Sequence, residues 1–203
     1  MIAIIDYGVG NLFSVKSSFK YIGYDAVVTG DKELIEKCDK ILLPGVGAFE
    51  DAIAKLRETG LDKVLIEQAN KGKKIMGICL GMQLLFEYSY EFGTHRGLGL
   101  LKGSVVGMKG KIPENLKIPH IGYNPLIFKR EHPLFKYIKN GDCVYFVHSY
   151  YAEDCEDSLL ATCEYGKELT AVCGKDNVMG CQFHPEKSGD VGLNILRAFC
   201  EME

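Results

Sequence analysis

The sequence predicts an α/β fold with a mostly parallel central sheet, helices on both faces and a smaller mixed or antiparallel extension. In the first half, short apolar runs alternate with amphipathic segments of helical spacing, as in a parallel sheet covered on both sides. From Gly97 to about Cys181, short strand and turn signals replace the helices. Neither an internal repeat nor a linker interrupts the 203 residues, so we expect a single domain over residues 1–203.

Apolar runs and helical spacing place the elements of the first half. Strands are expected at Ile2–Ile5, Ala26–Val28, Lys40–Leu43 and Ile75–Ile78. Helices are expected at Asn11–Ile22, from Lys32 onward with Asp31 as its cap, and at Phe49–Glu58, Leu61–Lys71 and about Leu80–Tyr90.

The second half is expected to consist of short strands followed by one helix. The strand signals cover Leu98–Met108, Ile118–Phe128, Cys143–Tyr150, Leu159–Tyr165, Leu169–Gly174 and Val178–Phe183. A final helix is expected at about Gly189–Met202, where apolar residues recur on one face.

Composition argues against several classes of protein. The net charge of −3 and the pI near 6.0 give no electrostatic reason to expect a nucleic-acid partner. No stretch approaches the roughly 18 apolar residues needed to cross a membrane, and the N-terminus lacks the basic segment of an export signal. We therefore expect a cytoplasmic protein without a membrane partner.

The eight cysteines do not form a metal or disulfide pattern. None of them forms a Cys-x-x-Cys pair, which zinc sites favour, and Cys163, Cys173 and Cys181 fall in strand-like runs. Asp6–Asn11 is a glycine turn but not a dinucleotide fingerprint. We expect reduced thiols, no metal and no cofactor.

Cys79 has the sequence context of a nucleophile. It lies in Gly77-Ile78-Cys79-Leu80-Gly81, between a buried run and a helical segment, which is the layout of the nucleophile elbow of Gly-x-Ser-x-Gly hydrolases. The flanking glycines permit a strained turn, and helix N–H groups near the sulfur favour thiolate over thiol. The alternative is a buried cysteine on a tight turn.

A matching base lies near the end of the chain. His184-Pro185-Glu186 follows a strand-like run, and Pro185 biases His184 toward an extended backbone. Because residues two apart on an extended chain point the same way, both side chains are expected to face the rim that holds Cys79. Nucleophile, base and orienting carboxylate together indicate acyl transfer through a thioester. Alone, the His-x-Glu step fits a capping or core histidine beside a surface glutamate.

A second glycine turn is expected on the same rim. Gly45-Val46-Gly47 directly follows the Ile41–Leu43 run, and ligands of parallel sheets sit at the carboxyl ends of the strands. Backbone N–H groups of this turn and of Leu80 are candidates to bind an oxyanion. A plain helix-entry turn is the structural alternative.

The chain resembles the triad-type (class I) glutamine amidotransferases over nearly its whole length, and more narrowly the glutaminase subunits of imidazole glycerol phosphate synthase. The segments that carry the resemblance are Ile5–Leu12, Leu43–Phe49, Gly77–Phe86, Pro119–Asn124, Tyr145–Tyr150 and Gln182–Gly189. The chain has Tyr123 where tryptophan often stands in the family, which leaves the details of partner docking open.

The resemblance implies hydrolysis of L-glutamine to glutamate and ammonia, with the ammonia channelled to a barrel-shaped cyclase/synthase subunit in a heterodimer. That partner would form imidazole glycerol phosphate and AICAR in histidine biosynthesis. The implied triad is Cys79, His184 and Glu186. The implied oxyanion and substrate residues are Gly45, Val46, Gly47, Leu80, Gln83, Glu91, His148, Ser149 and Tyr150, and the implied partner-facing residues are Tyr7, Asn11, Tyr123 and Lys187. Glu91, about two helical turns past Gln83, would meet the α-ammonium group of glutamine.

Three other functions remain open from the sequence. A paralogous glutaminase could feed a different synthase, such as one that aminates a sugar nucleotide. A cysteine peptidase or other hydrolase could share the elbow. A binding module with a degenerate triad is disfavoured because all three triad residue types are present.

Overall fold

The computed structural model describes all residues, 1–203. Its helices are α1 (Leu12–Tyr21), α2 (Lys32–Lys37), α3 (Phe49–Thr59), α4 (Leu61–Asn70), α5 (Leu80–Leu84) and α6 (Gly189–Glu201), with short 3₁₀ turns at Pro133–Phe135 and Pro185–Lys187. Its strands are β1 (Ile2–Ile5), β2 (Ala26–Thr29), β3 (Lys40–Leu43), β4 (Lys74–Ile78), β5 (Phe86–Ser89), β6 (His95–Arg96), β7 (Leu101–Gly107), β8 (His120–Pro125), β9 (Ile127–Phe128), β10 (Cys143–His148), β11 (Tyr150–Glu153), β12 (Leu159–Glu164), β13 (Glu168–Lys175) and β14 (Val178–Cys181).

The central sheet confirms the predicted fold class. Its strand order is β2-β1-β3-β4-β14-β13-β12-β9, and the pairings from β2 to β14 are parallel while those from β14 to β9 are antiparallel. The parallel β4 and β14 are neighbours, with Ile78 beside Cys181. Their carboxyl ends therefore bring residue 79 and the segment after residue 181 to the same edge.

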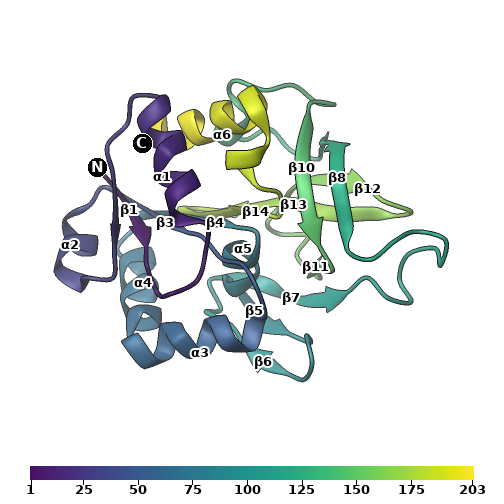
Figure 1. Ribbon diagram of the computed structural model, residues 1–203, viewed down its shortest axis with the longest axis horizontal. Helices are drawn as coiled ribbons and strands as arrows, with labels where there is room; N and C mark the ends of the chain where they lie inside the picture. The colour runs from purple at the N-terminus through teal and green to yellow at the C-terminus, as the bar shows by residue number, and fades with distance from the viewer.

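Helices cover both faces of the sheet. Alternate residues of β1 enter two apolar clusters, Ile2 and Ile4 one and Ala3 and Ile5 the other. The first cluster packs against α1 and α6, and the second against α2, α3, α4 and α5. Figure 1 shows α1 and α6 above the sheet and α3, α4 and α5 below it. Such continuous apolar strands are typical of a sheet buried on both faces.

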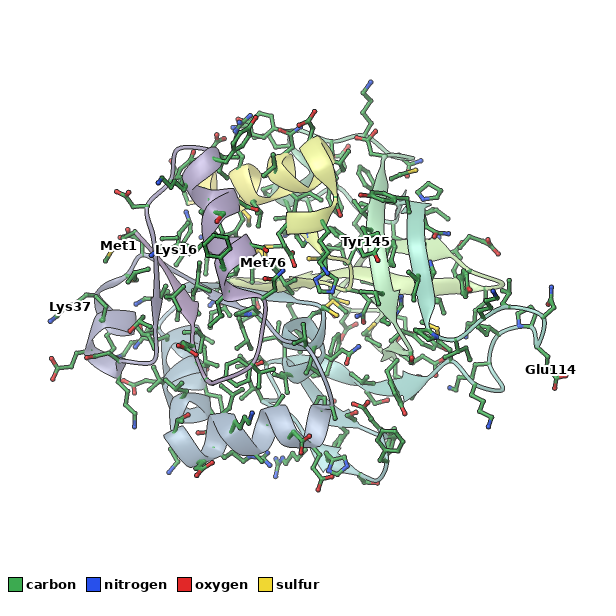
Figure 2. All side chains as sticks on the ribbon, viewed as in Figure 1. Met1, Lys16, Lys37, Met76, Glu114 and Tyr145 are labelled. Atoms are coloured by element: carbon green, nitrogen blue, oxygen red, sulfur yellow. The ribbon has the colours of Figure 1, made fainter.

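The predicted extension is divided between the central sheet, which β13, β12 and β9 continue antiparallel, and two small sheets. β10 and β8 form an antiparallel pair, and β11-β7-β5-β6 form a four-stranded mixed sheet. The chain between β7 and β8 projects away from the body, with Glu114 on this projection (Figure 2). None of the helices is long and apolar enough to cross a membrane.

The predicted helix over Leu80–Tyr90 is wrong in its second half. α5 ends at Leu84, and Phe86–Ser89 forms β5, which pairs with β7 and β6. Gly97 makes this arrangement possible, because a Cβ there would lie 2.1 Å from the Phe86 carbonyl oxygen. The aromatic run Phe86-Glu87-Tyr88 suits a strand once pairing partners are available. Elsewhere, Asp31 caps α2 as expected, by accepting a hydrogen bond from the Leu34 N–H.

Candidate active site

Cys79 occupies a strained turn between β4 and α5. Its backbone has φ 54°, a left-handed value that is unusual for any residue with a Cβ. The Cys79 N–H donates to the Cys181 carbonyl at 2.8 Å, which ties the turn to β14. A Cβ at Gly77 would lie 2.6 Å from the Gly81 backbone. The two glycines therefore allow the sharp reversal that sequence analysis expected of a nucleophile elbow.

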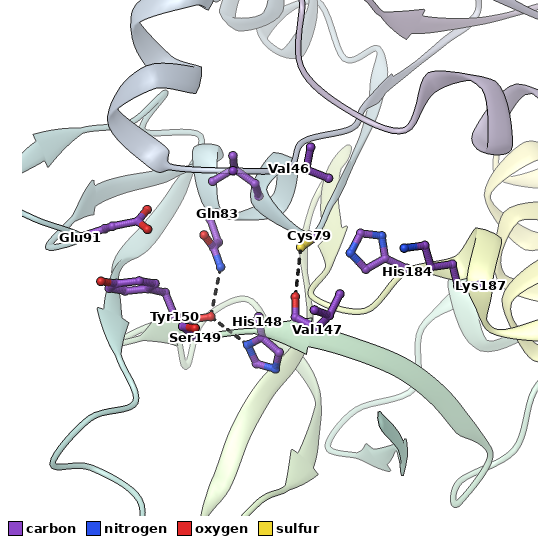
Figure 3. Close-up of a pocket in the computed structure, with 12 residues that line it drawn as sticks. Val46, Cys79, Gln83, Glu91, Val147, His148, Ser149, Tyr150, His184 and Lys187 are labelled. Carbon is purple, nitrogen blue, oxygen red and sulfur yellow. Dashed lines mark hydrogen bonds between the residues drawn. The ribbon is translucent and has the colours of Figure 1, made fainter. Parts of the chain in front are cut away.

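The turn faces a pocket of about 350 Å³. Most of the residues proposed for the site from the sequence line it together: Val46, Gly47, Cys79, Leu80, Gln83, Glu91, His148, Ser149, Tyr150 and His184. Figure 3 shows the His184 ring on one side of the Cys79 sulfur and the Gln83 and Glu91 side chains on the other. A small polar molecule with groups at both ends fits such a lining.

His184 lies between the thiol and a carboxylate. His184 Nδ1 lies 2.9 Å from Glu186 Oε1, with both side chains almost fully buried, and the ring lies beside the Cys79 sulfur (Figure 3). Burial disfavours the charged ring, but its interactions with Cys79 and Glu186 outweigh burial and raise the pKa of His184 to about 9. A charged imidazolium beside a thiol is the pairing that activates cysteine nucleophiles.

The predicted reason for the His184–Glu186 contact is incomplete. His184 is extended as expected (φ −101°, ψ 100°), but Glu186 lies in the 3₁₀ turn Pro185–Lys187 rather than on an extended chain. Two contacts fix the start of this turn: the His184 N–H donates to the Tyr145 carbonyl at 2.9 Å, and the Ser188 hydroxyl donates to the His184 carbonyl at 2.6 Å. The turn thereby brings the Glu186 carboxylate to Nδ1 of the His184 ring.

Replacing Glu186 by Gln is expected to lower the pKa of His184 and to slow glutamine hydrolysis by roughly 10³–10⁴-fold, less than loss of the nucleophile. The charged ring stabilises the folded chain fully below its ordinary pKa of about 6.5, and this contribution disappears as pH rises through about 9. An NMR titration of the His184 ring from about pH 5 to pH 10, in both proteins, measures the shift. Equal pKa values and equal rates would remove Glu186 from the triad.

The two glycine turns meet as expected, although Gly45 has a packing position. Val46 and Gly47 line the pocket opposite Leu80, and Gly47 has φ +92°. Gly45 is buried behind them, where a Cβ would lie 2.7 Å from the Gly81 nitrogen and 2.9 Å from the Tyr7 hydroxyl. The space at Gly45 therefore allows the turn after β3 to reach α5.

Glu91 reaches the pocket by a different route from the one predicted. It follows β5 in a turn instead of lying on a helix, and its Oε2 accepts a 2.7 Å hydrogen bond from the Phe49 N–H at the start of α3. Burial raises the pKa of this carboxyl, although the Phe49 hydrogen bond acts in the opposite direction. A buried carboxylate at one end of the pocket is suited to an ammonium group.

Gln182 and Val147 were not proposed from the sequence. Gln182 Nε2 lies 3.7 Å from the Cys79 sulfur, and Gln182 Oε1 accepts from Gln83 Nε2 at 3.0 Å. The Val147 carbonyl lies 4.0 Å from the same sulfur. Gln182 directly precedes Phe183-His184 on the way out of β14 and is fully buried. The sequence signal that could have drawn attention to it is a glutamine inside the apolar run Val178–Phe183, two residues before the proposed base.

The proposed partner-facing residues lie in different surroundings. Tyr123 is 60% exposed, donates its hydroxyl to the Lys187 carbonyl at 2.7 Å and packs against Tyr145, whose ring centre is 5.4 Å away. Lys187 also lines the pocket, and Figure 2 shows Tyr145 on β10 beside α6. Asn11 is half-buried at the start of α1. Tyr7 is buried and donates to the Pro44 carbonyl at 2.8 Å, so its ring packs inside and offers no docking surface.

Comparison with known proteins gives one family. The model of the class I glutamine amidotransferase family matches residues 3–202. The imidazole glycerol phosphate synthase subunit HisH of Caldanaerobacter subterraneus subsp. tengcongensis is 55% identical over 100% of this chain and 98% of its own length, and that of Sulfurimonas denitrificans is 52% identical over 98% and 97%.

Solved structures support the fold. A glutamine amidotransferase crystal structure superposes with a TM-score of 0.76 at 18% identity and covers 98% of this chain and 100% of its own. A structure of PurLQS from Thermotoga maritima gives 0.75 at 21% identity, covering 98% and 96%. The family match over nearly all residues and the relatives above half identity lead to one conclusion: the chain belongs to the class I glutamine amidotransferases.

Proposed function

We propose that this chain is the glutaminase subunit of an imidazole glycerol phosphate synthase, that residues 1–203 act as one glutaminase domain, and that it delivers ammonia to a cyclase subunit in histidine biosynthesis. The observation that carries the chemistry is Cys79 at φ 54° facing a pocket, with the buried His184–Glu186 pair beside it. The full-length relatives named HisH support the choice of pathway and partner.

In the proposed reaction, the Cys79 thiolate attacks the side-chain amide carbon of L-glutamine. The oxygen that becomes negative lies between the Leu80 N–H and the Val46–Gly47 turn, and donors of this kind are each worth about 3 kcal/mol of barrier. The His184 imidazolium protonates the departing ammonia, which leaves a glutamyl thioester. Neutral His184 then accepts a proton from water as the water attacks, and glutamate is released.

The pocket matches a zwitterionic amino acid. Glu91 supplies one buried carboxylate for the α-ammonium group, while Ser149 and backbone N–H groups of the lining can serve the α-carboxylate. Gln83 uses both hydrogens of its amide on the Tyr150 carbonyl, at 3.1 Å, and on Gln182 Oε1. Its own oxygen is therefore the group left to accept an N–H of the substrate.

We assign the partner surface to the patch formed by Tyr123, Tyr145 and Lys187, together with Asn11 at the start of α1, a helix that contacts the Pro185–Lys187 turn. Lys187 belongs both to this patch and to the pocket wall, and its ammonium group lies 5.9 Å from the centre of the Tyr145 ring. A protein that covers the patch is therefore next to the place where ammonia forms.

The purified chain should hydrolyse glutamine slowly alone and about tenfold faster or more with the histidine-pathway cyclase subunit and its nucleotide ligand, because partner binding is coupled to the site. Glutamate release is the measurement, and an unrelated synthase that aminates a sugar nucleotide is the control partner. Stimulation by the control partner alone would assign the ammonia to a different synthase. No turnover with either partner, in a folded and reduced protein, would favour a binding module.

A further inference from the structure

A line of buried hydrogen bonds runs from strand β8 to the pocket. His120 on β8 and His148 on β10 are directly paired across the two strands, and His120 Nδ1 lies 3.1 Å from His148 Nε2. His148 Nδ1 lies 2.9 Å from the Tyr150 carbonyl oxygen, the same oxygen that accepts from Gln83 (Figure 3). His120 lies outside the pocket lining and is fully buried.

His120 is packed on both faces of its ring and has a hydrogen-bond partner at each ring nitrogen. Its ring is stacked between Tyr165, with ring centres 4.0 Å apart, and Phe146, with centres 5.0 Å apart. The Asn124 side-chain amide closes the far end, with its oxygen 2.7 Å from His120 Nε2. A buried polar side chain fixed on every side, yet outside the pocket, calls for a physical explanation.

The donor and the acceptor in each hydrogen bond of the line can be assigned by starting at the Tyr150 carbonyl, next to the pocket. The Tyr150 carbonyl can only accept, so His148 Nδ1 must carry a proton. Burial lowers the pKa of His148 to about 3 and lowers that of His120, so both rings are neutral. Neutral His148 then accepts at Nε2, which requires a proton on His120 Nδ1 and leaves His120 Nε2 as an acceptor.

Asn124, at the other end of the line, must then donate a hydrogen bond to His120 Nε2. An acceptor nitrogen at His120 Nε2 cannot face the Asn124 oxygen, so the amide must be turned to present its NH₂ group. The turned amide would bring its oxygen against the Glu164 carbonyl oxygen, and both are acceptors, so the Asn124 side chain must also move away from Glu164. That contact lies at the exposed side, where water can donate to both oxygens. Each contact of the two neutral rings, from Asn124 to the Tyr150 carbonyl, then pairs one donor with one acceptor.

We propose that His120 is a positioning residue for the glutamine pocket: it keeps neutral His148 protonated on Nδ1, and thereby holds the Tyr150 carbonyl and orients the Gln83 amide. The inference rests on the proposed glutaminase function. The Tyr150 carbonyl and Gln182 Oε1 hold the NH₂ of Gln83, so the Gln83 oxygen points to the substrate. An acceptor there favours the amide and ammonium groups of glutamine over a carboxylate.

The first test reads the histidine tautomers in the whole chain. Nitrogen-15 NMR of the imidazoles near neutral pH should show His120 and His148 both neutral and both protonated on Nδ1. Protonation of His148 on Nε2, or a charged ring at either position, would overturn the proposal. This measurement needs no activity, so it separates failure of the inference from failure of the proposed function.

The second test separates binding from the rate of attack. His120→Phe keeps a ring between Phe146 and Tyr165 but removes the donor, whereas His120→Asn places an amide N–H where Nδ1 stood. The reagent is a glutamine-analogue chloroketone that alkylates Cys79. In His120→Phe, the chloroketone concentration that gives half-maximal labelling rate (the half-saturating concentration) should rise about tenfold. In His120→Asn, it should stay close to the wild-type value.

His132→Phe is the matched control, because His132 is a half-buried histidine near Phe135 with no contact to the line. It should leave the half-saturating concentration unchanged. Destabilisation alone would reduce the amount of labelled protein without changing that concentration. An unchanged half-saturating concentration in His120→Phe, or equal effects of the Phe and Asn variants, would overturn the proposal.

Discussion

The Cys79→Ala variant should lose glutamine hydrolysis by about 10⁵-fold or more while remaining folded, because no other group can form the thioester. The sulfur makes only weak contacts, at 4.0 Å to the Val147 carbonyl and 3.7 Å to Gln182 Nε2. Alanine retains the Cβ and carries the same backbone strain at φ 54°. We therefore expect the free energy of unfolding to change by only about 1 kcal/mol.

The rate of glutamate release is measured with the cyclase subunit present, because the wild-type rate then exceeds the background by the largest factor. Urea unfolding followed by circular dichroism reports stability. Cys143→Ala is the matched control, since Cys143 is an exposed cysteine on β10, remote from the pocket lining. It should hydrolyse glutamine like the wild type. Hydrolysis by Cys79→Ala at more than a trace would refute the covalent mechanism.

Apolar patterning identified the elements whose positions follow from burial alone. The continuous apolar runs of β1, β3 and β4 and the amphipathic stripe of α6 were all predicted because burial alone determines them. The end of α5 was missed because Phe86–Ser89 becomes a strand only by pairing with β7, which comes later in the chain. Contacts of this kind override local preference.

The proposed triad residues could be predicted from the sequence because the chemistry requires those residue types in that local context. Gln182 and His120 were missed because each acts through a contact that local sequence does not record: Gln182 with Gln83, 99 residues away, and His120 with His148, across two strands. Glu91 was placed in the pocket for the wrong reason, since the helix that was expected to carry it stops at Leu84.

The other large effect is expected from Gly81→Ala, a change of one methyl group at the point where α5 touches the end of β3. A Cβ at Gly81 would lie 1.8 Å from the Leu43 carbonyl oxygen and 2.8 Å from its carbon, both of them backbone atoms. Backbone atoms of a central strand cannot yield as a flexible side chain would. We expect α5 to be pushed away, with a loss of about 3 kcal/mol in the free energy of unfolding.

The same displacement should impair catalysis in the molecules that remain folded. Gly81 lies two residues after Cys79, and Gly45 packs against the Gly81 nitrogen, so moving α5 separates Cys79 and Leu80 from the Val46–Gly47 turn. Because a shift of about 1 Å in reacting groups costs about 100-fold in rate, kcat/KM should fall by at least that factor.

Gly107→Ala is the matched control for this change. A Cβ at Gly107 would meet its nearest atom, a Tyr150 ring carbon, at 3.4 Å, which is an ordinary contact. Its unfolding free energy should stay within about 1 kcal/mol of the wild type. The chain contains no tryptophan, so unfolding is followed by circular dichroism or tyrosine fluorescence. Equal urea midpoints and equal kcat/KM for Gly81→Ala and Gly107→Ala would show that α5 can move without disturbing Cys79. The close approach of α5 to β3 would then not be what holds the nucleophile turn in place.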